Sequence, residues 1–110
     1  MPEITSKNAR QWSRMGSRAV LGQAILLLAE TKKNLMILSA DLGGSSGLSR
    51  FKNAYPDNFL NVGISEQNMI GMASGLAREG FVVFATSFAP FLSMRSSEQV
   101  RMNMGYMDAN

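Results

Sequence analysis

Side chains that can do chemistry come directly after each of three apolar runs in the sequence. The runs are residues 35–40, 59–62 and 81–85, and the side chains that follow them are Asp41, Glu66, Phe88 and Phe91. A carboxylate can pair with a cation or share a proton, and phenylalanine rings provide flat apolar walls. Because the chain has no histidine and no cysteine, any catalysis must use carboxylates, hydroxyls, basic side chains or a borrowed cofactor.

Each apolar run has the length and composition of a buried strand in a parallel sheet. Segments typical of helices alternate with these runs and span residues 18–30, 51–55, 66–79 and 90–104. This alternation predicts an α/β fold with a parallel sheet, flanking helices and right-handed crossovers. In such sheets ligands bind beyond the carboxyl ends of the strands, so we expect the four side chains to share one site.

The predicted helix that begins at Glu66 contains two glycines, Gly71 and Gly75, which lie four residues apart on one face. A glycine inside a helix costs about 1 kcal/mol relative to alanine, which predicts that another backbone packs closely against this face. Glu66 itself has a simpler alternative role, because the helix dipole favours an acidic side chain in the first turn.

A chain of 110 residues has room for one domain, which we expect at residues 16–110 after an N-terminal arm at residues 1–15. The arm is predicted to be mobile or to form a short helix. The net charge of +3 is concentrated in the first third of the chain, but the basic residues there are scattered. A solvated or subunit-facing surface is therefore favoured over nucleic-acid binding. No apolar run reaches membrane-span length and no signal-peptide core is present, which favours a cytoplasmic protein.

Residues 63–77, with the sequence GISEQNMIGMASGLA, resemble the glutamate motif of the pyrimidine-binding domain of transketolase-type, thiamine-diphosphate-dependent enzymes. The resemblance extends over residues 18–101. Within this family, the sequence resembles in particular the short C-terminal subunits of bacterial transketolases that are split into two polypeptides. Gln67 stands where many single-chain transketolases have histidine, which favours the split or synthase-like branches of the family.

The resemblance implies a cofactor-binding role for four residues. Glu66 matches the glutamate that hydrogen-bonds the aminopyrimidine ring of thiamine diphosphate and is the implied catalytic residue. Phe88 and Phe91 match aromatic residues that stack on the same ring. The alternative is that the two phenylalanines merely cap the hydrophobic core, which would give the same sequence pattern. Asp41 matches an acidic residue that faces the thiazolium side of the cofactor.

Two further matches concern the substrate. Arg18 and Ser45 match positions that some transketolases use to grip a sugar phosphate, and the planar donor fork of arginine suits phosphate. The alternative for the loop that contains Ser45, residues 43–47, is a flexible glycine-rich turn. Its glycines do not form a phosphate-binding signature.

The function implied by the resemblance is transfer of a two-carbon ketol unit between sugar phosphates. The family binds the diphosphate through a divalent metal, Mg²⁺ in the expected case, held by a separate domain whose motif this chain does not contain. We therefore expect no metal ligands in this chain, which would be the first part of the domain, and activity only in an oligomer with a diphosphate-binding partner subunit. The alternatives are a non-catalytic truncated fragment that acts as an interaction module, and a subunit similar to deoxyxylulose-phosphate synthases or 2-oxo acid dehydrogenases.

Overall fold

A three-stranded parallel sheet lies between two layers of helices in the computed structural model, which describes residues 4–42 and 44–109. The strands are β1 (Leu35–Ser39), β2 (Phe59–Asn61) and β3 (Val82–Thr86). Their spatial order is β2-β1-β3, so the first strand in the chain is central. The predicted α/β fold with a parallel sheet is confirmed.

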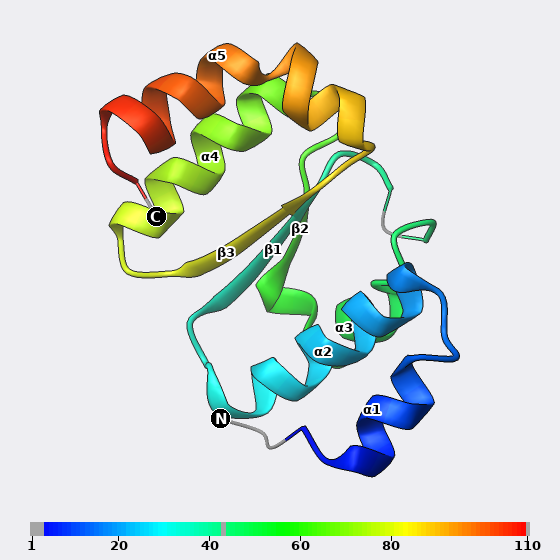
Figure 1. Cartoon of the computed structure of the whole chain (residues 1–110). Coiled ribbons are helices and arrows are strands. Elements are labelled where there is room, and N and C mark those ends of the chain that lie inside the picture. The colour runs from blue at the N-terminus through cyan, green and yellow to red at the C-terminus, as the bar shows by residue number, and fades with distance from the viewer. Residues whose placement is uncertain (1–3, 43, 110) are drawn as a thin grey trace.

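The helices follow the predicted order along the chain. The α-helices are α1 (Ser6–Trp12), α2 (Ser17–Thr31), α3 (Ser49–Ala54), α4 (Glu66–Arg78) and α5 (Ser97–Val100). There is also a 3₁₀ turn, η1 (Pro56–Asn58), and there are two π-helical turns, η2 (Phe91–Arg95) and η3 (Arg101–Tyr106). Helices α2 and α3 cover one face of the sheet, and α4 and α5 lie on the other (Figure 1). Helix α1 falls within the predicted N-terminal arm, whose residues 1–3 lie outside the described residues.

The carboxyl ends of the three strands lie side by side. Ser39 at the end of β1 is in register with Asn61 of β2 and with Thr86 of β3. Because the strands are parallel, the loops that follow them leave the sheet at the same edge. The pairing thus brings together three segments that are far apart in the sequence.

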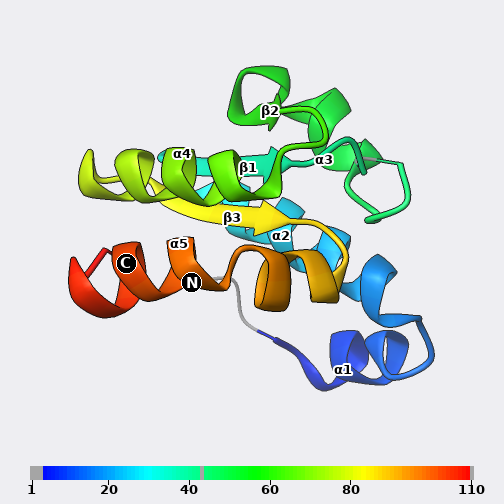
Figure 2. The same cartoon turned by 90° about the horizontal axis from the view of Figure 1, so that it is seen from above.

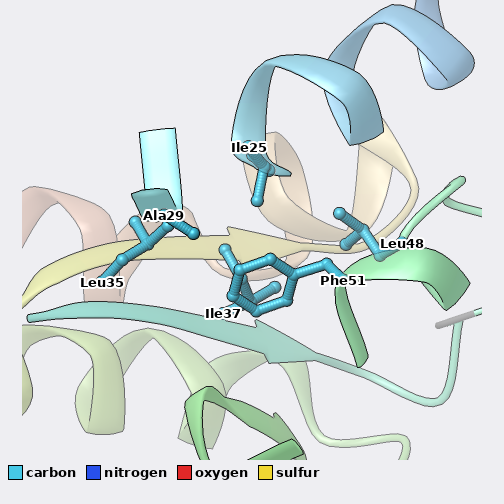
Figure 3. Packing of buried hydrophobic residues seen from close by; sticks show 6 residues of the cluster. All are labelled: Ile25, Ala29, Leu35, Ile37, Leu48 and Phe51. Atoms are coloured by element: carbon cyan, nitrogen blue, oxygen red, sulfur yellow. The ribbon is translucent and has the colours of Figure 1, made fainter. Parts of the chain in front are cut away.

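The side chains of β1 alternate between two hydrophobic cores, as expected for a strand buried on both faces. Leu35 and Ile37 face α2 and α3, and Figure 3 shows them with the buried residues of that core, Ile25, Ala29, Leu48 and Phe51. Leu38 and Ala40 instead pack with Met69 of α4. The sheet is therefore fixed from both sides, and α4 is held by its own buried contacts.

The prediction that a backbone packs against Gly71 and Gly75 is wrong within this chain. Both glycines are exposed, and a Cβ added to either would meet nothing within 4 Å. Close backbone packing occurs instead between α2 and the loop after β1. A Cβ on Gly22 would clash with the carbonyl oxygen of Gly47, whose φ of +78° suits glycine.

The segment after β3 differs from the single helix predicted for residues 90–104. Two π-helical turns, η2 and η3, flank the one α-helical turn of α5. Side chains compete for the backbone here, since Ser96 Oγ donates a hydrogen bond of 2.9 Å to the carbonyl oxygen of Phe91. Figure 2 shows this segment beside α4. π-Helical turns are rare in proteins, and those that occur often lie at functional sites.

Candidate functional site

Glu66 is the first residue of α4 and is only 4% exposed. Ser87, which follows β3, donates a hydrogen bond from Oγ to Glu66 Oε1 at 3.4 Å. Arg95 Nη1 donates to Glu66 Oε2 at 3.3 Å. The unpaired N–H groups of the first helical turn add the positive end of the helix dipole. A negative carboxylate is thus held by positive and polar groups in a place largely closed to water.

Phe88 and Phe91 form an aromatic pair in the segment that also carries Ser87 and Arg95, the two residues bonded to Glu66. Their ring centroids lie 5.9 Å apart and the rings are tilted by 65°, a favoured edge-to-face arrangement. Phe88 is 47% exposed, so part of its ring is open to a ligand. The guanidinium of Arg95 lies over the ring of Phe91, with Cζ 4.0 Å from the centroid. Met94 is 75% exposed and adds no buried apolar surface.

A pocket of about 240 Å³ opens at the same edge of the sheet. It is lined by the loop after β1, the loop after β3 and the start of α2, with the residues Arg18, Leu21, Leu42, Ser45, Ser46, Ala85, Thr86, Ser87, Phe88 and Leu92. Arg18 Nη1 donates a hydrogen bond to the carbonyl oxygen of Ser45 at 3.3 Å. The close contact of Gly22 with Gly47 explains this placement, since it holds the loop against α2.

Asp41 takes a left-handed conformation, with φ of 60°, directly after β1, and it is exposed. The amide side chain of Asn61 joins it to the loop after β2. Asn61 Oδ1 accepts hydrogen bonds from the backbone N–H of Asp41 and of Gly63, both at 3.0 Å, and Nδ2 donates to Asp41 Oδ1 at 3.1 Å. Asn61 therefore fixes two of the three loops relative to each other.

The structure separates the six predicted site residues into three groups. Arg18, Ser45 and Phe88 line the pocket, while Glu66 and Phe91 both contact Arg95. Asp41 lies outside the pocket lining and is bonded to Asn61. Gly43, in the same loop as Ser45, lies outside the described residues.

Sequence reasoning missed Asn61, Ser87 and Arg95. Asn61 ends a strand and Ser87 follows one, so the rule that selected Asp41 and Phe88 would have selected both of them too. Arg95 carries no such signal, because its partner Glu66 is 29 positions away in the chain.

Chemically, the arrangement suits a flat heterocycle that carries N–H groups. A buried carboxylate accepts hydrogen bonds from such groups, and aromatic rings pack against its faces. Across residues 4–42 and 44–109, no group of three or more acidic side chains is placed to hold a metal ion. Within the same ranges, no helix has the length and apolar character needed to cross a membrane.

Comparison with known proteins identifies the domain. The family model described as "Transketolase, pyrimidine binding domain" matches residues 13–110. A putative transketolase C-terminal section from Methanocaldococcus jannaschii is 43% identical over 95 residues, which are 86% of this chain and 30% of that protein. A 6-deoxy-6-sulfo-D-fructose transketolase subunit from a Clostridium species is 37% identical over 86 residues, 78% of this chain and 27% of that protein.

A synthase and a solved structure are also similar to this chain. A 1-deoxy-D-xylulose-5-phosphate synthase from Desulfotalea psychrophila is 38% identical over 81 residues, 74% of this chain but 12% of that protein. Among solved structures, one described as "Split gene transketolase, inactive beta4 tetramer" aligns with a TM-score of 0.67 and 39% identity. The alignment covers 74% of this chain and 27% of that one. This chain therefore spans less than a third of the length of each of these relatives, and it belongs to the transketolase family through its pyrimidine-binding domain.

Proposed function

We propose that this chain supplies the pyrimidine-binding part of a thiamine-diphosphate site in an enzyme that transfers two-carbon ketol units between sugar phosphates. One observation carries the proposal. The carboxylate of Glu66 is buried at the start of a helix and is bonded to Ser87 and Arg95, which lie in the same segment as the paired rings of Phe88 and Phe91. Family membership and the names of the relatives support the same assignment.

The donors and acceptors present fit the aminopyrimidine ring of that cofactor. Glu66 would share a proton with a nitrogen of the ring through one carboxyl oxygen. Ser87 would orient the other oxygen through its hydroxyl, and Phe88 with Phe91 would pack against the flat faces. Asp41, whose position is fixed by Asn61, would lie toward the thiazolium side.

When bound, thiamine diphosphate supplies a nucleophilic carbon that carries the two-carbon unit. The protein's part is proton transfer and positioning. Glu66 holds and moves a proton at its carboxylate oxygen, and its burial keeps bulk water from competing for that proton. Phe88 and Phe91 would exclude water from the ring, while Arg18 and Ser45, which line the pocket, would bind the phosphate of the sugar.

A partner subunit that binds the diphosphate and its Mg²⁺ completes the proposed enzyme. The relatives support this arrangement, because two of them are named as a section or subunit of a transketolase. This chain spans 30% and 27% of those proteins, so the proposal assigns to it only the pyrimidine-binding part of the site.

Two other functions have specific support. The match to a 1-deoxy-D-xylulose-5-phosphate synthase favours the alternative of a subunit similar to such synthases or to 2-oxo acid dehydrogenases. The solved relative described as an inactive tetramer favours a non-catalytic assembly module. In either case the ring site would be inherited, but ketol transfer between sugars would be absent.

Replacement of Glu66 tests the proposal. The Glu66→Gln variant and the wild-type chain are each combined with the diphosphate-binding subunit, thiamine diphosphate and Mg²⁺, and two-carbon transfer from a ketose phosphate to an aldose phosphate is measured. We expect a loss of turnover of at least about 100-fold, since general acid–base catalysis contributes 10²–10⁴-fold. Glu98→Gln, which changes an exposed carboxylate, should retain activity. Full activity of Glu66→Gln would exclude the role, and activity only with a 2-oxo acid donor would favour the synthase-like alternative.

A further inference from the structure

Arg95 makes both of the contacts that the proposed ligand ring would make. Its guanidinium lies over the ring of Phe91, with Cζ 4.0 Å from the centroid, and Nη1 donates to Glu66 Oε2 at 3.3 Å. A guanidinium is flat and rich in N–H donors, so it can stack on an aromatic ring and bond a carboxylate at the same time. An aminopyrimidine is likewise flat, and its amino group donates hydrogen bonds.

The backbone that carries Arg95 is fixed, while its side chain is half open to solvent. Gln67 Nε2 donates to the carbonyl oxygen of Arg95 at 3.0 Å, which joins the turn η2 to the start of α4. Ser96, the next residue, is fully buried and bonds back to Phe91. The side chain of Arg95 is nevertheless 51% exposed. It can therefore rotate out to solvent without any movement of the turn.

Without Arg95, the buried carboxylate of Glu66 would keep Ser87 as its side-chain hydrogen-bond partner. A buried charge with too few partners is costly. Arg95 offsets that cost when no ring is bound. A ligand ring would compete with Arg95, because the two cannot occupy the same carboxylate oxygen of Glu66 and the same face of Phe91 at the same time.

We propose that Arg95 is a displaceable internal ligand: its guanidinium contacts Glu66 and Phe91, the two groups proposed to hold the ring, and must leave when an aminopyrimidine binds. This inference rests on the proposed function, because it takes Glu66 and Phe91 as the ring site. The apparent affinity for the ring is then reduced by the fraction of molecules in which Arg95 is closed. A half-exposed ion pair together with a cation–π contact contributes modestly, so we expect removal of the side chain to tighten binding about 3- to 10-fold.

The test uses an aminopyrimidine that lacks the thiazolium and the diphosphate, 4-amino-5-hydroxymethyl-2-methylpyrimidine, so that no partner subunit is required. Its dissociation constant for the full chain is measured by isothermal titration calorimetry. Arg95→Ala and Arg95→Met should bind it about 3- to 10-fold more tightly than wild type. Arg95→Lys keeps a charge but loses the planar fork, so its dissociation constant should lie between those of wild type and Arg95→Ala. Arg101→Ala, which removes an arginine from an exposed pair with Glu98, should bind like wild type.

A second readout needs no ligand affinity. NMR of the arginine side chains should show restricted guanidinium rotation for Arg95 in the ligand-free chain and free rotation once the pyrimidine is added. Unrestricted rotation in the ligand-free chain, or equal affinity of wild type and Arg95→Ala, would overturn the role of Arg95 alone. Binding that Glu66→Gln leaves unchanged would instead contradict the proposed function. Absence of binding to every variant would count against both.

Discussion

Ser87 Oγ lies 3.4 Å from Glu66 Oε1 and joins the loop after β3 to the start of α4. Ser87 also lines the pocket that holds Arg18 and Ser45. One hydroxyl therefore connects the buried carboxylate to the pocket. This contact exists because β1 places the ends of β2 and β3 at the same edge of the sheet.

Ser87→Ala should lower the free energy of unfolding by about 1 kcal/mol, because the buried carboxylate loses a hydrogen-bond donor. Urea denaturation followed by circular dichroism measures the change. Ser97→Ala, at an exposed serine in the first turn of α5, should stay within about 0.5 kcal/mol of wild type. Equal effects of the two substitutions would show that the hydroxyl of Ser87 does not stabilise Glu66.

Asn61→Ala should destabilise the chain by about 1–3 kcal/mol, since it removes two hydrogen bonds to Asp41 in the loop after β1 and one to Gly63 in the loop after β2. The same denaturation experiment measures it. Asn68→Ala is a matched control on the exposed face of α4, where the side-chain amide donates a weak hydrogen bond to the sulfur of Met72. An Asn61→Ala chain as stable as the control would mean that the loops hold their positions without this side chain.

Gly22→Ala and Gly71→Ala should change stability in opposite directions. A methyl group on Gly22 would collide with the backbone of Gly47, which should cost about 1–3 kcal/mol. A methyl group on Gly71 meets open space in a helix interior, so it should add up to about 1 kcal/mol of stability. Thermal unfolding of the isolated chain distinguishes the two. A destabilised Gly71→Ala chain would mean that α4 has a close neighbour in solution.

The exposed pair of Glu98 and Arg101 should give a small stability term that depends on pH. The hydrogen bond from Arg101 lowers the pKa of Glu98 below its ordinary value of 4.5. A carboxyl whose pKa is lowered in the folded state stabilises the protein at pH values above its pKa in the unfolded state. This stabilisation is lost as the pH falls through the pKa of the folded state. The difference in urea midpoint between wild type and Glu98→Gln should therefore shrink between pH 6 and pH 3. A difference that grows toward low pH would contradict the pairing.

The elements that position the site could be predicted from the sequence, because each strand is a continuous apolar run and the helices between them show regular apolar spacing. The position of Glu66 at the start of a helix, after a strand, was predicted in the same way and is confirmed. The parallel sheet then places Asp41, Glu66 and Phe88 at one edge. These features depend on local patterns, which a single sequence contains.

The contacts that complete the site could not be predicted. The pair of Arg95 and Glu66 joins residues 29 positions apart, and the π-helical turn that carries Arg95 has no clear sequence pattern. The glycines were also misassigned, because the sequence shows that Gly71 and Gly75 share a face but not whether anything packs there. Gly22, where close packing does occur, lies in an apolar helix and looks like an ordinary small residue.

The central claim, that this chain is one subunit of a thiamine-diphosphate enzyme, is tested most directly by native mass spectrometry of the chain purified gently from its own cells with thiamine diphosphate and Mg²⁺. The proposed function predicts an assembly that contains this chain, a larger diphosphate-binding subunit and bound cofactor. A chain that is found alone or only with copies of itself, without cofactor, would contradict it.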